Sequence, residues 1–225
     1  MEVVICDNGC LGIQAKNTYE SIRSCIGDDF WFVLMPETRD SFADAIEWAV
    51  DIKHVVVCEP STIGGFVKRN RIYDMFPNAA WITRISPGVI VTEDYFNYLK
   101  LHKRDRTVSA VGAVGYFIHG NWEGIDGNEV PPRHISHVLD DVLWSWKADE
   151  YRYEFPFNNI CLGHYDHQMF FHKKGLNCLT TPSSAVQFIP DELDYDETLF
   201  EAVKYLATKW SKKLDFLRTN EITRI

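Results

Sequence analysis

The sequence lacks the short motifs that mark several common nucleotide-binding and hydrolytic enzymes. Its 225 residues contain no GxSxG, Walker A or GxGxxG pattern. Such patterns place a nucleophilic serine or a phosphate-binding glycine loop at a fixed turn of the backbone. Their absence argues against a serine hydrolase, a P-loop enzyme and a dinucleotide-binding protein of the usual kind.

The chain also has too little positive charge for a general nucleic-acid-binding protein. It carries 23 Lys and Arg against 32 Asp and Glu, for a net charge of −9, whereas nucleic-acid binding requires a cationic surface. No apolar run approaches the roughly 20 residues that span a bilayer. The start, MEVVICDNG, lacks the basic segment and long apolar stretch of a signal peptide.

Cysteine pairs at redox or metal-binding spacing are absent too. The six cysteines include no CxxC pair and lie at positions 6, 10, 25, 58, 161 and 178. Cys6 and Cys58 fall within apolar runs, where a free thiol behaves as a small hydrophobic side chain. We therefore expect reduced, structural cysteines and a cytoplasmic location, which would be the host cytoplasm if the protein is viral.

The composition that is present suits one globular domain over residues 1–225. Hydrophobic residues make up 46% of the chain and charged residues 24%, which is ordinary for a folded domain. Aromatic residues reach 14%, with seven Trp. They can form core, or line a cleft that stacks the rings of bases or sugars.

The first half alternates apolar runs with amphipathic segments. Four runs predict strands, namely Glu2–Cys6, Phe30–Met35, Val55–Cys58 and Ala79–Ile85. Two predicted helices, Asn17–Ile26 and Phe42–Val50, separate the first three, and Ser41 is the expected N-cap of the second. This alternation predicts an α/β fold with a single, mostly parallel, Rossmann-like sheet flanked by helices, an α/β/α sandwich.

The second half is less regular. A long loop rich in Gly, Pro, Asn and His is predicted over His119–His137, and loops of that length are usually functional or disordered. The other predicted elements are the strand Thr107–Phe117 and the helices Tyr95–Leu101, Val138–Trp146, Asp166–Lys174 and Asp196–Leu217.

Polar residues follow the first and third predicted strands. Asp7 and Asn8 come after the first strand, and Glu59 and Ser61 come after the third. Polar groups at the carboxyl ends of parallel strands line the ligand crevice of an open α/β sheet. Turn formation is the alternative, since Asp and Asn favour tight turns.

A basic run follows a flexible glycine pair. Lys68, Arg69, Asn70 and Arg71 come shortly after Gly64-Gly65 and before the next strand. A glycine loop leading into a cationic helix can hold a phosphorylated ligand, because arginine contacts phosphate with two donors and lysine acts as a mobile charge. A solvated helix face is the alternative.

Asp140 and Asp141 stand at the start of the helix predicted after the long loop. A carboxylate beside an aromatic, histidine-rich loop suits a general base for a hydroxyl group. Acidic residues in a first helical turn are also common because they complement the helix dipole.

Histidines crowd the second half without matching a known zinc motif. The segment GHYDHQMFFH holds His164, His167 and His172 at spacings that match neither HExxH nor a zinc finger. One histidine that binds a metal or an acceptor remains an open alternative.

The order of several segments resembles the nucleotide-sugar half of GT-A glycosyltransferases over residues 2–175. The segments that carry the resemblance are Glu59-Pro60-Ser61, Arg69-Asn70, Ala80-Trp81-Ile82-Thr83 and Glu93-Asp94-Tyr95-Phe96. More narrowly, the chain resembles the N-terminal glycosyltransferase domain of chlorella-virus enzymes that build capsid-protein glycans. The resemblance implies transfer of a hexose or pentose from a nucleotide sugar, with UDP as the expected nucleotide, to a hydroxyl of a glycan or glycoprotein.

The resemblance also implies roles for named residues. Residues 1–117 form the nucleotide-sugar half, and residues 118–225 form the acceptor-side half and a C-terminal helix. Asp141 is expected to act as the base, with Asp140 as its neighbour. The expected donor-binding residues are Asp7, Asn8, Glu59, Ser61, Lys68, Arg69, Asn70 and Arg84.

The chain departs from the family where a metal-binding Asp-x-Asp is expected. It has Ile85-Ser86-Pro87-Gly88 there, and Pro and Gly offer no side-chain oxygen to a hard cation. Either Mn²⁺ or Mg²⁺ is held elsewhere, with Asp140 and His164 as candidates, or Arg69 and Arg84 neutralise the diphosphate. Two other classes stay open: a non-catalytic nucleotide- or glycan-binding domain, and a metallohydrolase using His164, Asp166 and His167.

Overall fold

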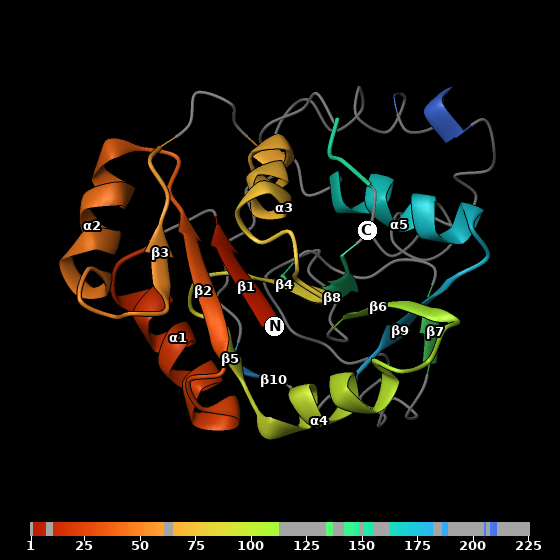
Figure 1. Ribbon diagram of the computed structural model, residues 1–225, viewed down its shortest axis with the longest axis horizontal. Coiled ribbons are helices and arrows are strands. Elements are labelled where there is room, and N and C mark those ends of the chain that lie inside the picture. The colour runs from red at the N-terminus through yellow and green to blue at the C-terminus, as the bar shows by residue number, and fades with distance from the viewer. Residues whose placement is uncertain are drawn as a thin grey trace, which may run out of the picture.

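The computed structural model describes residues 2–7, 11–60, 65–112, 134–136, 142–148, 151–154, 163–181, 186–188, 205 and 208–210. Strands and helices alternate through the first half of the chain, as expected (Figure 1). The elements are β1 Glu2–Asp7, α1 Ile13–Ile26, β2 Phe30–Met35, α2 Arg39–Ala49, β3 Val55–Val57, η1 Gly65–Asn70, α3 Arg71–Met75, β4 Trp81–Ile85, β5 Ile90–Val91, α4 Glu93–His102, β6 Val108–Gly112, β7 His134–Ser136, β8 Leu143–Lys147, α5 Gly163–Lys173, β9 Asn177–Thr180 and β10 Val186–Phe188.

One eight-stranded sheet forms the centre of the described structure. Its strand order is β3-β2-β1-β4-β8-β6-β9-β7. The run β3-β2-β1-β4 is entirely parallel, β8 is antiparallel to both of its neighbours, β9 is parallel to β6, and β7 is antiparallel to β9. The strand that starts at residue 2 is interior, and the prediction of a mostly parallel α/β sheet is confirmed.

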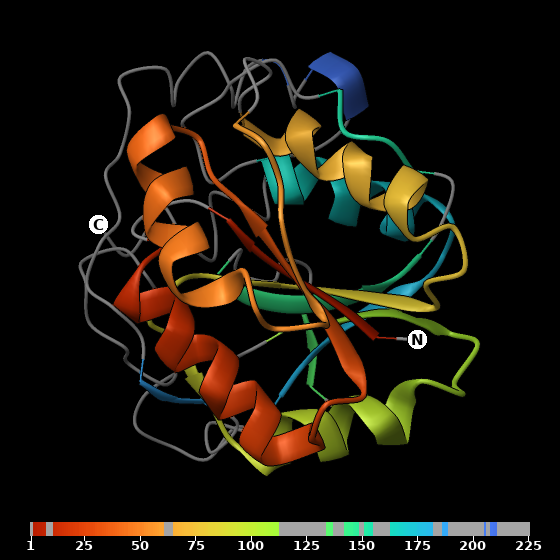
Figure 2. The same ribbon diagram turned by 60° about the vertical axis from the view of Figure 1, so that its left-hand side comes forward.

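Helices cover both faces of the sheet, which is why strands β1 and β2 are largely apolar on both faces. Helices α1, α2 and α4 contribute to one buried cluster, while α3 and α5 contribute to another. In the turned view, α3 and α5 lie above the sheet and α1 and α4 lie below it (Figure 2).

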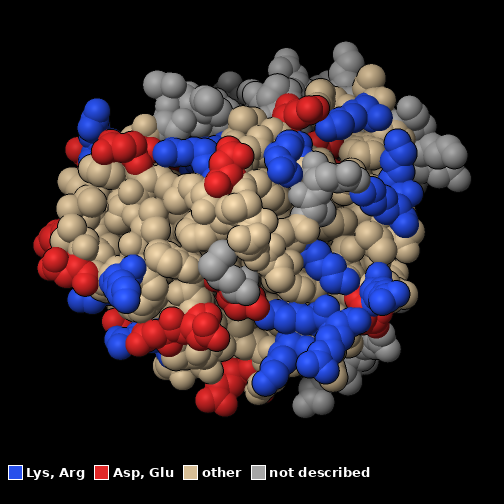
Figure 3. All heavy atoms as spheres, in the orientation of Figure 1, with Lys and Arg blue, Asp and Glu red and all other residues tan. Residues whose placement is uncertain are grey.

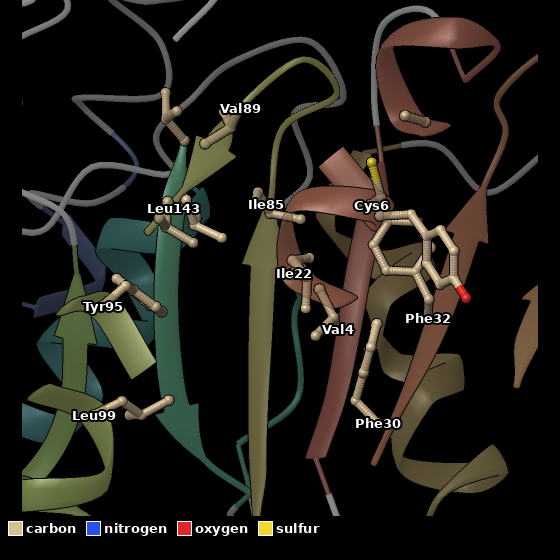
Figure 4. Close-up of a cluster of buried hydrophobic side chains, with 14 of the residues drawn as sticks. Val4, Cys6, Ile22, Phe30, Phe32, Ile85, Val89, Tyr95, Leu99 and Leu143 are labelled. Carbon is tan, nitrogen blue, oxygen red and sulfur yellow. The ribbon is translucent and has the colours of Figure 1, made fainter. Parts of the chain in front are cut away.

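The strand pleat divides the core between these two faces. On β1, Val4 and Cys6 belong to the first cluster, whereas Val3 and Ile5 belong to the second. This alternation is the two-residue period of a strand. Figure 4 shows the first cluster, in which Val4 and Cys6 lie beside Phe32 of β2.

The helix predicted over Val138–Trp146 is wrong where the structure describes it, because Leu143–Lys147 forms strand β8. The predicted loop His119–His137 is wrong near its end, because His134–Ser136 forms strand β7 and pairs with β9. In the sequence LWSWK, residues two positions apart lie on the same face of the strand. Trp144 and Trp146 pack into the second core cluster and Leu143 into the first. The signal of a strand was present, but the preceding Asp140-Asp141 pair favoured a helix start.

The N-cap of α2 also differs from the prediction. The helix begins at Arg39 and its cap is Thr38, whose backbone is extended and whose hydroxyl accepts a 3.1 Å hydrogen bond from the Ser41 backbone N–H. Ser41 therefore lies in the first turn as the residue being capped. Both residues are good caps by type, so composition did not separate them.

The described cysteines are reduced. Cys6, Cys25, Cys58 and Cys178 are all free thiols, and burial raises the pKa of Cys178 to about 12. Cys10 and Cys161 lie outside the described residues. Within the described part of the chain, no helix has the length and apolar character needed to cross a bilayer.

The two hydroxyls at the start of α2 give a matched test of the cap. We expect Thr38→Ala to lower the free energy of unfolding by about 1 kcal/mol, because it removes the cap acceptor. Ser41→Ala keeps that acceptor and should change it by less than about 0.5 kcal/mol. Urea unfolding followed by circular dichroism measures both, and equal losses would contradict this cap assignment.

Candidate active site

A buried carboxylate flanked by two arginines lies where β1 ends. Asp7 is fully buried, and its Oδ2 accepts a 2.7 Å hydrogen bond from Arg69 Nε. Its Oδ1 accepts from Arg84 Nε at 2.8 Å and from Arg69 Nη2 at 3.3 Å. Arg84 Nη2 also donates to the Asp7 backbone carbonyl at 3.3 Å. We call these three residues the Asp7–arginine cluster.

Sheet topology brings the three residues together from distant parts of the sequence. Strands β1 and β4 are parallel neighbours, with Ile5 opposite Arg84. Their carboxyl ends therefore meet at one edge of the sheet, the edge where open α/β folds bind ligands. Arg69 comes from η1, the segment that leads into α3.

The electrostatics of the cluster favour an ionised carboxylate. Burial alone would raise the pKa of Asp7, but the charges of Arg69 and Arg84 outweigh it and hold that pKa far below its usual range. Both guanidinium groups are themselves almost completely buried. The carboxylate thus fixes two arginine side chains in a site of low dielectric, where their charges act strongly on any nearby anion.

The basic run divides between interior and surface. Lys68 is 3% exposed and its ammonium donates to Glu37 Oε1 at 2.8 Å, so the solvated-face alternative is wrong for Lys68 and Arg69. Arg71 is exposed and donates to the Glu59 backbone carbonyl at 3.1 Å. Glu59, two residues beyond the end of β3, is exposed.

Asn70 joins the first half of the chain to the second. Its amide donates to the Tyr153 carbonyl at 2.9 Å and accepts from the Tyr153 backbone N–H at 2.8 Å. The Tyr153 hydroxyl lies 3.0 Å from His167 Nδ1, and its ring lies 5.9 Å from the Arg69 guanidinium. Tyr153 therefore borders the Asp7–arginine cluster, a contact with no signal in the local sequence.

The residues after β4 do not fit a divalent cation. The Ser86 hydroxyl accepts a 2.6 Å hydrogen bond from Arg84 Nη1, so this oxygen already lies beside a positive charge. The Gly88 N–H donates to Thr18 Oγ1 at 2.9 Å, in a left-handed backbone conformation (φ +86°) that favours glycine. Among the described residues, no group of three His, Cys, Asp or Glu side chains could hold a metal.

Asp166 and His167 of α5 are engaged by neighbouring side chains. Asp166 is fully buried and accepts from the Tyr151 hydroxyl at 2.5 Å, from Lys209 Nζ at 2.7 Å and from Trp210 Nε1 at 2.7 Å. The His167 ring stacks on that of Tyr151, with the centroids 4.2 Å apart. These contacts explain both residues without a metal, and His164 lies buried nearby on the same helix.

Four predicted site residues lie outside the described part of the chain, namely Asn8, Ser61, Asp140 and Asp141. The chain neighbour of Asp141 is described, however. The Val142 carbonyl accepts a 2.8 Å hydrogen bond from the Ser86 N–H, directly after β4. The backbone that follows the two aspartates thus meets the same sheet edge as Asp7 and Arg84.

No family model and no curated protein matches the chain. Solved structures do match. The mannosyltransferase PcManGT from Pyrobaculum calidifontis, in complex with GDP-Man and Mn²⁺, matches with a TM-score of 0.60 at 13% identity, over 82% of this chain and 55% of that one. GalNAc-T7 with UDP, GalNAc and Mn²⁺ matches with a TM-score of 0.66 at 12% identity, over 92% and 47%.

TarS of S. aureus, residues 1–349, matches with a TM-score of 0.63 at 10% identity, over 92% of this chain and 64% of that one. The chain therefore spans roughly half to two thirds of the length of these structures. At such low identities the likeness shows the fold alone. The chain has a GT-A-like fold, as predicted.

Asp7→Asn tests the role of the buried carboxylate. Removing one partner of a buried charge cluster should cost about 3–5 kcal/mol of unfolding free energy at pH 7, since two guanidinium groups lose their counter-charge. Asp28→Asn is the matched control: its partner is Arg23 in a half-exposed ion pair, so its cost should stay below about 1 kcal/mol.

The destabilisation caused by Asp7→Asn should depend on pH. The pKa of Asp7 is lowered in the folded state, so its stabilisation is fully present above the unfolded pKa of about 3.9 and is lost as the pH falls toward the folded value. The deficit of Asp7→Asn relative to the parent chain should shrink by about 1 kcal/mol between pH 7 and pH 3. Urea titrations at both pH values measure it, and a constant deficit would contradict the assignment.

Proposed function

We propose that this chain transfers a sugar from a nucleotide-sugar donor to a hydroxyl acceptor. The observation that carries the proposal is the Asp7–arginine cluster at the carboxyl ends of β1 and β4 in a GT-A-like sheet. This edge is where open α/β sheets bind their ligands. Two fixed guanidinium groups there suit a diphosphate.

Glycosyl transfer requires stabilisation of a departing nucleoside diphosphate. Preorganised donors aimed at developing negative charge are usually the largest catalytic contribution. Arg69 and Arg84 meet that requirement, because Asp7 holds both side chains before a ligand arrives. In this proposal Asp7 acts mainly by positioning the arginines. Asn8, Glu59, Ser61, Lys68 and Asn70 complete the proposed donor-binding set.

The identity of the donor nucleotide and the binding of a metal ion are further parts of this proposal. We propose a UDP-sugar from the family resemblance; the similar structures include one with UDP and one with GDP-Man, and both contain Mn²⁺. A divalent cation would supply Lewis-acid stabilisation of the diphosphate. The described residues after β4 do not fit one, so Asp140 and His164 remain the proposed ligands and no step here depends on a metal.

The acceptor half of the reaction is assigned to Asp141, with Asp140 beside it. In an inverting transfer, the Asp141 carboxylate takes the acceptor hydroxyl proton as the acceptor oxygen bonds to the anomeric carbon. The bond from that carbon to the diphosphate oxygen breaks, and the nucleoside diphosphate leaves with the electron pair. The proximity of Val142 to Ser86 supports placing this base near the donor edge.

Three further expectations remain predictions: a glycan or glycoprotein acceptor, a cytoplasmic location, and the narrower likeness to chlorella-virus capsid-glycan enzymes.

A non-catalytic nucleotide-binding domain is the second candidate function, favoured by the sequence Ser86-Pro87-Gly88 at the expected metal position. Titration of UDP- and GDP-sugars with Mn²⁺ and with EDTA, followed by assay of donor hydrolysis, separates them. Binding without turnover would favour the second candidate, and metal binding without nucleotide affinity would favour a metallohydrolase.

Arg69→Lys tests the donor site. The substitution keeps the charge but removes the planar fork that can contact phosphate with two donors, so affinity for the UDP-sugar should fall at least about tenfold. Arg71→Lys is the matched control on the exposed part of the same run. Calorimetric titration compares the two, with thermal unfolding as a check of folding. Equal affinities would remove Arg69 from the donor site.

Asp141→Asn tests the proposed base. The amide cannot accept the acceptor proton, so transfer should fall by about 10²–10⁴-fold while donor binding is retained. Asp140→Asn should have the smaller effect of the two. Radiolabelled sugar transfer and donor affinity are measured in parallel. Unchanged turnover in Asp141→Asn would contradict its role, and a larger loss in Asp140→Asn would exchange the two assignments.

A further inference from the structure

A cluster of cations lies at the opposite edge of the sheet from the Asp7–arginine cluster. We call it the α4 basic patch, and it comprises Lys100, Lys103, Arg104, Arg106 and Lys147. Figure 3 shows basic side chains gathered in the lower right of the face in view, over the end of α4. In a chain with a net charge of −9, such a concentration of positive charge is unusual.

Two contacts bring Lys147 and Glu2 to the segment that follows α4. Lys147, at the end of β8, donates to the Asp105 backbone carbonyl at 2.7 Å. The Lys103 ammonium pairs with the carboxylate of Glu2. Among the residues named here, five cations outnumber two carboxylates, Glu2 and Asp105, so their summed charge is positive.

The helix dipole accounts for only part of the patch. A cation in the last turn of a helix complements the dipole, which explains Lys100 on α4. Arg104 and Arg106 lie beyond the helix and are exposed. Asp105 is occupied by the backbone N–H and hydroxyl of Thr107, at 2.9 and 2.7 Å.

An exposed apolar side chain stands within the patch. Leu101 is 71% exposed, directly between Lys100 and the cations that follow α4. A single exposed leucine is common on protein surfaces. Apolar residues set among Lys and Arg are, however, the pattern by which peripheral proteins engage the boundary between lipid headgroups and acyl chains.

The patch and the candidate active site lie at opposite ends of the same strand. Lys103 contacts Glu2, the first residue of β1, whereas Arg69 and Arg84 contact Asp7, its last residue. The five residue-to-residue steps from Glu2 to Asp7 span roughly 16 Å of extended backbone. A surface bound at the patch would leave the donor edge open to solvent.

We propose that the α4 basic patch docks the protein onto anionic lipid membranes, with Leu101 entering the headgroup region. The lysines and arginines supply the attraction to acidic headgroups, which falls off within a Debye length and weakens with salt. A nucleic acid would use the cations but would gain little from an exposed leucine, and an acidic protein is an outcome of the test below. This inference does not depend on the proposed sugar transfer.

Vesicle co-sedimentation of the full chain tests the proposal. Vesicles of phosphatidylcholine with about a third phosphatidylserine should bind the protein in low salt, and phosphatidylcholine alone should not. The double variant Lys100→Glu/Arg104→Glu should lose at least about 25-fold in partitioning, at roughly fivefold for each cation removed. Leu101→Ser should weaken binding several-fold without changing the charge.

The control variant is Lys16→Glu/Arg39→Glu, which makes the same charge change at exposed positions on α1 and α2. It should bind the vesicles far better than the patch variant. Thermal unfolding checks that all variants are folded. The proposal is overturned by absence of binding to anionic vesicles, by equal losses in the two double variants, or by a Leu101→Ser variant that binds as well as the parent chain. Preference for heparin or an acidic protein over the vesicles would also overturn it.

Discussion

The described site depends on one interaction, the sharing of the buried Asp7 carboxylate by two guanidinium groups. An isolated charge in the interior is strongly unfavourable, so each of the three residues is stabilised in its position by the opposite charge beside it. The cluster ties the end of β1 to the end of β4 and to η1. It therefore sets both the local geometry of the sheet edge and its electrostatic character.

Polar contacts of the same kind join the two halves of the chain. The Asn70 amide holds the backbone of Tyr153, and Tyr153 in turn contacts His167 of α5. Within the sheet, the Ser145 hydroxyl of β8 lies 2.6 Å from Thr83 Oγ1 and 2.8 Å from the Tyr95 hydroxyl. Both sets of contacts are buried or nearly so, where a polar group left unpaired would be costly, so they fix the relative placement of the elements they join.

Two groups of cations lie at opposite ends of the strands of the sheet. Cations at the carboxyl edge are buried and held by a carboxylate, as expected of a site that must act on a defined ligand. Cations of the α4 basic patch, at the other edge, are mostly exposed, as expected of a surface that acts through long-range attraction. Neither group of cations is apparent from the net charge of the whole chain, which is negative.

The strands of the first half, the helices between them and the fold class could be predicted from the sequence, because they follow from short-range periodicity and from continuous apolar runs. Asp7, Lys68, Arg69 and Arg84 were also recognisable as candidate site residues. The folded arrangement was needed to show that Lys68 and Arg69 point inward, that β8 replaces a helix, and that Asn70 holds Tyr153. Each of these outcomes depends on partners 31 to 83 residues away in the chain, and local sequence carries no information about such pairings.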